Sequence, residues 1–160
     1  MNLRPGIPAD IPLLIELERA SPTAAHWTEG QYRQAVEPGP GDQQRLVLVA
    51  EMALSDSAAG HSRPDVVGFL MARRVGLEWE LENIAVAPTA RRKGVGKRLI
   101  GALLAAARET NGESVFLEVR ELNVAARKLY ESAGFQQVGR RKSYYADPAE
   151  DAILCRRDLS

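Results

Sequence analysis

One stretch of the sequence, residues 81–99, restricts the fold more than any other. It begins with a strand-like apolar run that ends at Pro88, continues through a basic turn with two glycines, and enters a segment of helical periodicity. The apolar residues of that segment recur on one helix face: Leu99, Ile100, Leu103, Leu104 and Ala107. A strand, a glycine-bearing turn and a helix in this order are typical of an α/β protein with an anion-binding turn.

The turn between this strand and helix has the properties of an anion site. The first amides of a helix lack an intrahelical partner, and the helix dipole adds partial positive charge there. Gly94 and Gly96 have no Cβ, so the backbone can approach a phosphate closely. Arg92, Lys93 and Lys97 add positive charge. The glycine pair alone is neither a Walker loop nor a dinucleotide fingerprint, so an ordinary turn with a solvated basic rim remains the alternative.

Length and composition are those of an ordinary globular chain. The 160 residues suit one domain, predicted to span residues 1–160, and can bury a sizeable core. Apolar residues make up 45% of the chain and charged residues 26%, which are typical values. Because the formal net charge is zero, we expect no broad attraction to nucleic acid and no direct nucleic-acid partner.

The cysteine, histidine and hydropathy patterns exclude further classes. Cys155 is the only cysteine, which rules out an intrachain disulfide and a cysteine-based metal cluster. His26 and His61 are isolated in the sequence, so we expect no metal site. There is no apolar run of transmembrane length, and the N-terminus does not resemble a signal peptide. These patterns predict a cytoplasmic protein that has no membrane partner.

The rest of the chain is predicted to form a mixed sheet with helices on its faces, in the α/β class. Asp10 is the expected N-cap of the first helix, and residues 54–65 are expected to form a mobile hairpin loop. In the fourth strand Leu77, Trp79 and Leu81 share one face, opposite the alternating glutamates. Strands are predicted at 2–6, 45–53, 66–75, 77–86, 114–120, 135–141 and 152–157, and further helices at 29–36, 94–112 and 123–132.

Candidate catalytic side chains follow the glycine turn. Glu118 lies in a strand that should be central, where burying a carboxylate costs free energy unless it is paired or faces a cleft. Tyr130 lies on the following helix, where packing with a satisfied hydroxyl is the more common role. Tyr144 and Tyr145 stand beside a turn, where they either brace a hairpin or form a polar rim for a peptide.

The pattern Arg91-x-x-Gly94-x-Gly96 after an apolar strand resembles the acetyl-CoA motif of the GNAT N-acetyltransferases. In that superfamily the turn amides hold the CoA pyrophosphate, and the preceding strand pairs with the pantetheine arm. The resemblance implies a GNAT fold, with a central, mostly antiparallel twisted sheet flanked by helices, and acetyl-CoA as cosubstrate. The cofactor-binding residues that it implies are Ile84, Ala85, Val86, Arg91, Arg92, Lys93, Gly94, Val95, Gly96, Lys97 and Asn123.

From about residue 81 to 154 the sequence resembles the bacterial ribosomal-protein alanine N-acetyltransferases of the RimI type. The catalytic subunits of archaeal and eukaryotic N-terminal acetyltransferases are a looser match. By this resemblance Glu118 occupies the general-base position and Tyr130 the general-acid position. The substrate-binding residues that it implies are Trp27, Glu80, Glu82, Tyr144 and Tyr145.

The implied function is acetylation of a protein α-amine, with alanine as first residue and a ribosomal protein as a possible partner. Glu80 and Glu82 are rival bases, because some GNAT enzymes place the base on the fourth strand. Two alternatives remain at this level. One is an acetyltransferase of a small amine, antibiotic or lysine side chain, and the other is an acyl-CoA-binding sensor without turnover.

Overall fold

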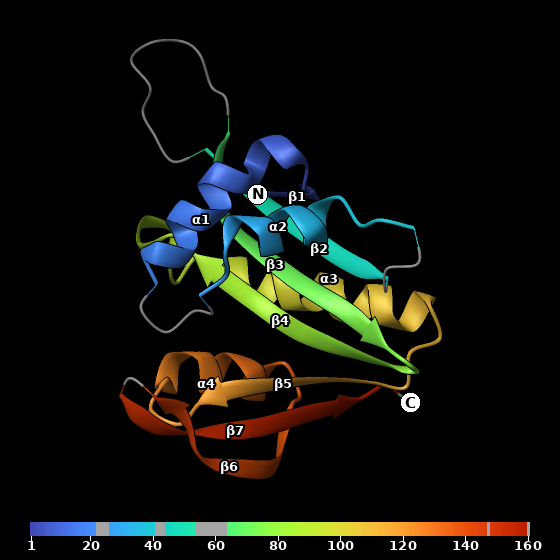
Figure 1. Ribbon diagram of the computed structural model, residues 1–160, viewed down its shortest axis with the longest axis vertical. Helices are drawn as coiled ribbons and strands as arrows, with labels where there is room; N and C mark the ends of the chain where they lie inside the picture. The colour runs from blue at the N-terminus through green and yellow to red at the C-terminus, as the bar shows by residue number, and fades with distance from the viewer. Residues whose placement is uncertain (22–25, 41–43, 54–63, 147, 160) are drawn as a thin grey trace.

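The computed structural model describes residues 1–21, 26–40, 44–53, 64–146 and 148–159 (Figure 1). The predicted loop at 54–65 falls largely outside this part of the chain, and His61 lies outside it. The elements are β1 (Asn2–Pro5), η1 (Pro8–Asp10), α1 (Ile11–Arg19), α2 (Glu29–Val36), β2 (Arg45–Met52), β3 (Asp65–Val75), β4 (Glu78–Val86), η2 (Pro88–Ala90), α3 (Val95–Glu109), β5 (Ser114–Arg120), α4 (Val124–Ser132), β6 (Gln136–Ala146) and β7 (Ala149–Asp158).

The strands form one mixed sheet in the order β1-β2-β3-β4-β5-β7-β6, which confirms the predicted fold class. All neighbouring pairs are antiparallel except β4 and β5. That parallel pairing is short, because it runs only from Glu78 opposite Ser114 to Glu80 opposite Phe116. Beyond this point the two strands separate toward their carboxyl ends, as Figure 1 shows. The separation positions the candidate site.

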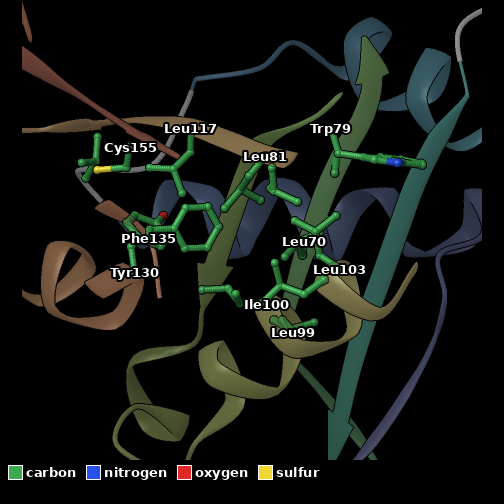
Figure 2. Packing of buried hydrophobic residues seen from close by; sticks show 14 of the residues in the cluster. Leu70, Trp79, Leu81, Leu99, Ile100, Leu103, Leu117, Tyr130, Phe135 and Cys155 are labelled. Carbon is green, nitrogen blue, oxygen red and sulfur yellow. The ribbon is translucent and has the colours of Figure 1, made fainter. Parts of the chain in front are cut away.

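Helices cover both faces of the sheet and define two cores. Apolar residues of α1 and α2 pack with Val49, Phe69 and Ala85 in the core that we call the α1–α2 core. Buried residues of α3, with Tyr130 and Phe135, form the second, called the α3–α4 core (Figure 2). The predicted apolar face of α3 is confirmed, since each of its five members is buried. Burying one such leucine or isoleucine contributes roughly 1.5–3 kcal/mol.

A β-bulge at Glu82 exchanges the two faces of β4. Ala72 of β3 pairs with Leu81, but the next residue, Met71, pairs with Asn83, so Glu82 is left without an opposite residue. Before the bulge Leu81 points into the α3–α4 core, whereas after it Asn83 hydrogen-bonds to Tyr32 on the α1–α2 side. The strict alternation predicted for this strand therefore holds only up to the bulge.

Two local predictions are wrong, and a third, the helix cap at Asp10, holds for its position only. Leu77 is exposed and precedes β4, because it lies in the tight turn after β3. Asp10 does occupy the N-cap position of α1, but its side chain caps none of the helix amides, since its carboxylate accepts bonds from Arg4, at 2.7 and 2.8 Å, and from the Ile7 amide at 2.8 Å. Finally, β6 and β7 extend well beyond 135–141 and 152–157, because their pairing continues to Ala146 opposite Ala149.

Candidate active site

A cavity of about 760 Å³ lies between the separated ends of β4 and β5. Its walls come from the segment before α2, from both strands, from α4 and from the end of β6. It brings together predicted residues that are far apart in sequence. Those that line it are Trp27, Glu80, Glu82, Ile84, Ala85, Val86, Arg91, Glu118, Asn123, Tyr130, Tyr144 and Tyr145.

The two predicted catalytic residues reach this cavity from opposite faces of the sheet. Leu117 and Val119 point into the α3–α4 core, so Glu118 between them faces the α1–α2 side. Tyr130 comes from the α3–α4 side. The Glu118 carboxylate forms an ion pair with Arg141 of β6, at 3.2 Å between Oε1 and Nε. The cavity thus offers a proton acceptor and a proton donor on opposite sides of one gap.

Tyr130 has the environment of a hydroxyl that stays protonated. Its ring packs edge-on against Phe135, with centroids 6.0 Å apart (Figure 2). No hydrogen bond joins its hydroxyl to any residue that the structure describes. Burial raises the pKa of Tyr130, and nearby Cys155 acts in the same direction. A buried phenol that lines a cavity without a protein partner is suited to give a proton to a bound group.

The rival bases on β4 are held by arginines of β2 and β3. Glu80 pairs with Arg73 at 2.9 Å, and Glu82 pairs with Arg45 at 2.6 Å. Burial raises the pKa of Glu82, although both arginines oppose this. The partner of Glu118 is the most exposed of the three, with 54% of the Arg141 side chain accessible against 38% for Arg73 and 20% for Arg45. Glu118 is therefore the carboxylate whose partner can leave most easily.

Aromatic side chains stand on two sides of the cavity. Tyr144 and Tyr145 contact each other edge-on, with centroids 5.2 Å apart, and the Arg120 guanidinium lies 4.0 Å from the Tyr145 centroid. On the other side Trp27 packs against Tyr32, with centroids 5.5 Å apart. These contacts fix the predicted substrate-binding aromatic rings on both sides of the cavity.

The turn at residues 91–94 leads into α3 as predicted. The first intrahelical bond runs from the Arg98 amide to the Gly94 carbonyl at 3.1 Å, so the preceding helix amides have no intrahelical acceptor. Gly94 has φ +79°, and a Cβ there would meet open space. Arg92 and Lys93 of this turn and Lys97 of α3 are exposed but are not among the residues that line the cavity.

Two predicted cofactor positions have a further structural role. A Cβ at Gly96 would lie 2.9 Å from Cδ2 of Leu129, so this glycine lets α3 pack closely against α4. The Val95 side chain belongs to the α3–α4 core, which leaves only its amide for a ligand. Asn123 lines the cavity, but its Oδ1 accepts the Ala126 amide at 3.2 Å and caps α4.

Sequence reasoning did not single out three polar residues of the site. Arg120 and Arg141 are hidden in an alternating strand pattern, because nothing local shows that they stack on tyrosines. Asn83 interrupts an apolar run, which is a usable signal for a buried polar contact. Its Nδ2 donates to the Tyr32 hydroxyl at 3.2 Å and to Glu18 at 3.4 Å.

The sequence model of the acetyltransferase (GNAT) family matches residues 14–135. The chain belongs to this family. Among curated relatives, N-alpha-acetyltransferase RimI of Mycobacterium tuberculosis is 43% identical over 97 residues, covering 58% of this chain and 60% of the relative. The [ribosomal protein bS18]-alanine N-acetyltransferase of Haemophilus influenzae is 43% identical over 92 residues, covering 56% of this chain and 62% of the relative. The matches thus span about three fifths of these relatives.

Solved structures of the GNAT family agree over nearly the whole chain. The ribosomal-protein-S18-alanine N-acetyltransferase of Escherichia coli superposes with a TM-score of 0.77 and 26% identity, covering 99% of this chain and 94% of that one. Ard1 of Thermoplasma volcanium superposes with a TM-score of 0.80 and 28% identity, covering 99% and 97%. These similarities confirm the RimI-type resemblance and the GNAT fold.

Neither a metal-binding cluster nor a membrane-spanning helix is found among the described residues. No group of three or more histidine, cysteine, aspartate or glutamate side chains in the described ranges is placed to hold an ion. No helix in the described part of the chain is long and apolar enough to cross a membrane.

Proposed function

We propose that the chain is an acetyl-CoA-dependent N-terminal acetyltransferase that modifies the α-amine of a protein with a small first residue, such as alanine. One observation carries the proposal, namely the cavity that Glu118 and Tyr130 line from opposite faces of the sheet. The names of the bacterial relatives support this acceptor class and suggest a ribosomal protein. Such an acceptor is made in the cytoplasm, where we propose that the enzyme acts.

The end of β4 and the turn after it fit acetyl-CoA. Past Glu80 the β5 side of β4 is unpaired, so the backbone at residues 84–86 is available to an extended ligand. The turn adds free amides at the start of α3 and an open position at Gly94. Arg92, Lys93 and Lys97 supply positive charge beside them, which suits a pyrophosphate and the ribose phosphate of CoA.

Acetyl-CoA, when bound, supplies an acetyl group that is activated as a thioester. In the proposed reaction a C–N bond forms to the acceptor amine and the C–S bond breaks. Glu118 accepts the amine proton, directly or through one water, and the Tyr130 hydroxyl gives its proton to the departing sulfur. Positioned acid–base groups of this kind contribute roughly 10²- to 10⁴-fold each. Holding both reactants in one gap contributes much of the remainder.

The chemistry of the acceptor favours an α-amine over a lysine. A free α-amine has a pKa of about 8 and a lysine amine about 10.4. At neutral pH roughly a tenth of α-amines are already neutral, against well under a thousandth of lysines. A single carboxylate paired with an exposed arginine is therefore better matched to the α-amine. The aromatic walls on two sides leave room for a peptide that enters end first.

A panel of acceptors tests the proposal. The enzyme is given acetyl-CoA with an alanine-initiated peptide, a lysine peptide blocked at its N-terminus, or a polyamine, and thiol release is measured. We expect turnover chiefly with the free alanine peptide, and loss of it in a Glu118→Gln, Tyr130→Phe double variant. Preference for the polyamine would favour a small-amine enzyme, whereas CoA binding without any turnover would favour a sensor.

A further inference from the structure

The Glu118–Arg141 ion pair links the wall of the candidate site to the edge strand β6. Glu118 faces the α1–α2 side of the sheet, and Arg141 reaches it from the edge strand β6. The glutamate side chain is 23% exposed and the arginine side chain 54% exposed. A guanidinium therefore stands next to the carboxylate that an acceptor ammonium would approach.

Arg141 is held there by an irregularity in β6. It pairs with Ala152, but the next registered pair is Tyr145 with Glu150, so residues 142–144 oppose the single residue Asp151. Ser143 in this bulge has φ +50°, a left-handed conformation that is uncommon for serine. Such a backbone persists only when its surroundings fix it.

Asp151 fixes the bulge from the neighbouring strand. Its Oδ1 accepts the Ser143 amide at 2.8 Å, and its Oδ2 accepts Arg140 Nη1, also at 2.8 Å. Arg140 is tied in addition to Glu121 at 2.7 Å. Both carboxylates within reach of Arg140 are thus engaged with it, whereas Arg141 on the other side of the strand is directed to Glu118.

The contacts of Arg141 allow it to leave. Within the described part of the chain it makes one ion pair, with Glu118, and its guanidinium lies 5.4 Å from the centroid of the exposed Tyr144 ring. Because more than half of the side chain is already in water, its release costs little desolvation energy. Glu118 is less exposed than Arg141, so its carboxylate is less well solvated and is stabilised more by a replacement cation.

We propose that Arg141 is a placeholder cation, which neutralises Glu118 in the free enzyme and is displaced by the acceptor's ammonium group. This inference rests on the proposed function, because it requires a charged amine as acceptor and Glu118 at the point of entry. Arg141 then sets acceptor affinity by competition and takes no part in acyl transfer. A neutral acceptor analogue would gain nothing from the exchange.

Steady-state kinetics with two variants of equal charge change test the competition. Arg141→Gln should lower KM for an alanine-initiated peptide by about two- to fivefold, the range expected of a partly exposed ion pair. The acetyl-CoA KM and kcat should stay close to wild type. Lys142→Gln removes a neighbouring exposed charge and should leave the peptide KM unchanged, whereas Arg141→Lys should retain the wild-type value.

An uncharged inhibitor isolates the charge exchange. A peptide that begins with lactic acid in place of alanine carries a hydroxyl and no ammonium, so its inhibition constant should be the same for wild type and Arg141→Gln. An unchanged or raised peptide KM in Arg141→Gln would overturn the inference, as would equal tightening of the lactyl peptide. If the wild type does not acetylate the alanine peptide at all, this result contradicts the proposed function itself, and with it the inference that rests on it.

Discussion

Replacing Tyr130 by phenylalanine removes one hydroxyl from the cavity wall and leaves the packing in place. The ring meets Phe135 at an interplanar angle of 62° and sits among buried residues of the α3–α4 core (Figure 2). No described residue accepts a hydrogen bond from its hydroxyl, so the substitution breaks no such bond. The free energy of unfolding should therefore change by less than about 1 kcal/mol.

The effect on catalysis should be much larger. A positioned general acid contributes about 10²- to 10⁴-fold, and each tenfold loss corresponds to about 1.4 kcal/mol of activation free energy. We expect kcat of Tyr130→Phe to fall at least tenfold, with little change in CoA affinity. Burial raises the pKa of Tyr130, so the phenol stays protonated as pH rises, and the wild-type kcat should not fall between pH 7 and the ordinary tyrosine pKa of about 10.

Thiol release under saturating substrates measures kcat, calorimetry measures CoA affinity, and thermal unfolding checks the fold. Tyr145→Phe is the matched control, since Tyr145 lines the same cavity and its ring is held by Arg120. It should retain most of the wild-type kcat. A near wild-type kcat for Tyr130→Phe, with acyl transfer shown to be rate-limiting in single-turnover experiments, would reduce Tyr130 to a packing residue.

Three further predictions follow from the site and its support. Glu118→Gln should lower kcat more than a Gln substitution at Glu80 or Glu82, and the reverse order in pH–rate measurements would move the base to β4. Gly96→Asp should weaken CoA binding in calorimetry by pushing Leu129 and adding negative charge, and unchanged affinity in a folded variant would contradict the cradle. Asp10→Asn should cost roughly 2 kcal/mol at pH 7 in denaturant unfolding. Because Arg4 lowers the pKa of Asp10, this stabilisation is complete above the ordinary aspartate pKa, declines as pH falls below it and is lost as pH falls through the lowered pKa of the folded state; a constant difference would refute the assignment.

Features with a local cause were predictable from the sequence. The apolar spacing at Leu99, Ile100 and Leu103 gives α3. Asn123 caps α4 and Gly134, at φ +89°, follows its end, as their residue types indicate. The helix at 29–36 is capped at its N-terminus by Thr28, whose hydroxyl accepts a hydrogen bond from the Gln31 amide. In each case the residues that predict the helix or its cap lie within a few positions of it in the sequence.

Features that depend on strand pairing were not predictable. The bulge at Glu82 arises from the register with β3, and it alone moves Asn83 to the α1–α2 side. The second role of Gly96 depends on Leu129 of another helix. The Glu118–Arg141 pair requires β5 and β6 to lie on either side of β7, an order that alternating residues do not reveal. The roles expected of Glu118 and Tyr130 follow from the resemblance, whereas the opposite faces from which they reach the cavity depend on the sheet.

The central claim, transfer to a peptide α-amine, is tested most directly by mass spectrometry of one peptide in two forms. The peptide begins with alanine and carries one internal lysine, and its N-terminus is either free or blocked. After incubation with the enzyme and acetyl-CoA, we predict one acetyl group on the α-amine of the free form and none on the blocked form. Equal or faster acetylation of lysine in the blocked form would contradict the α-amine assignment.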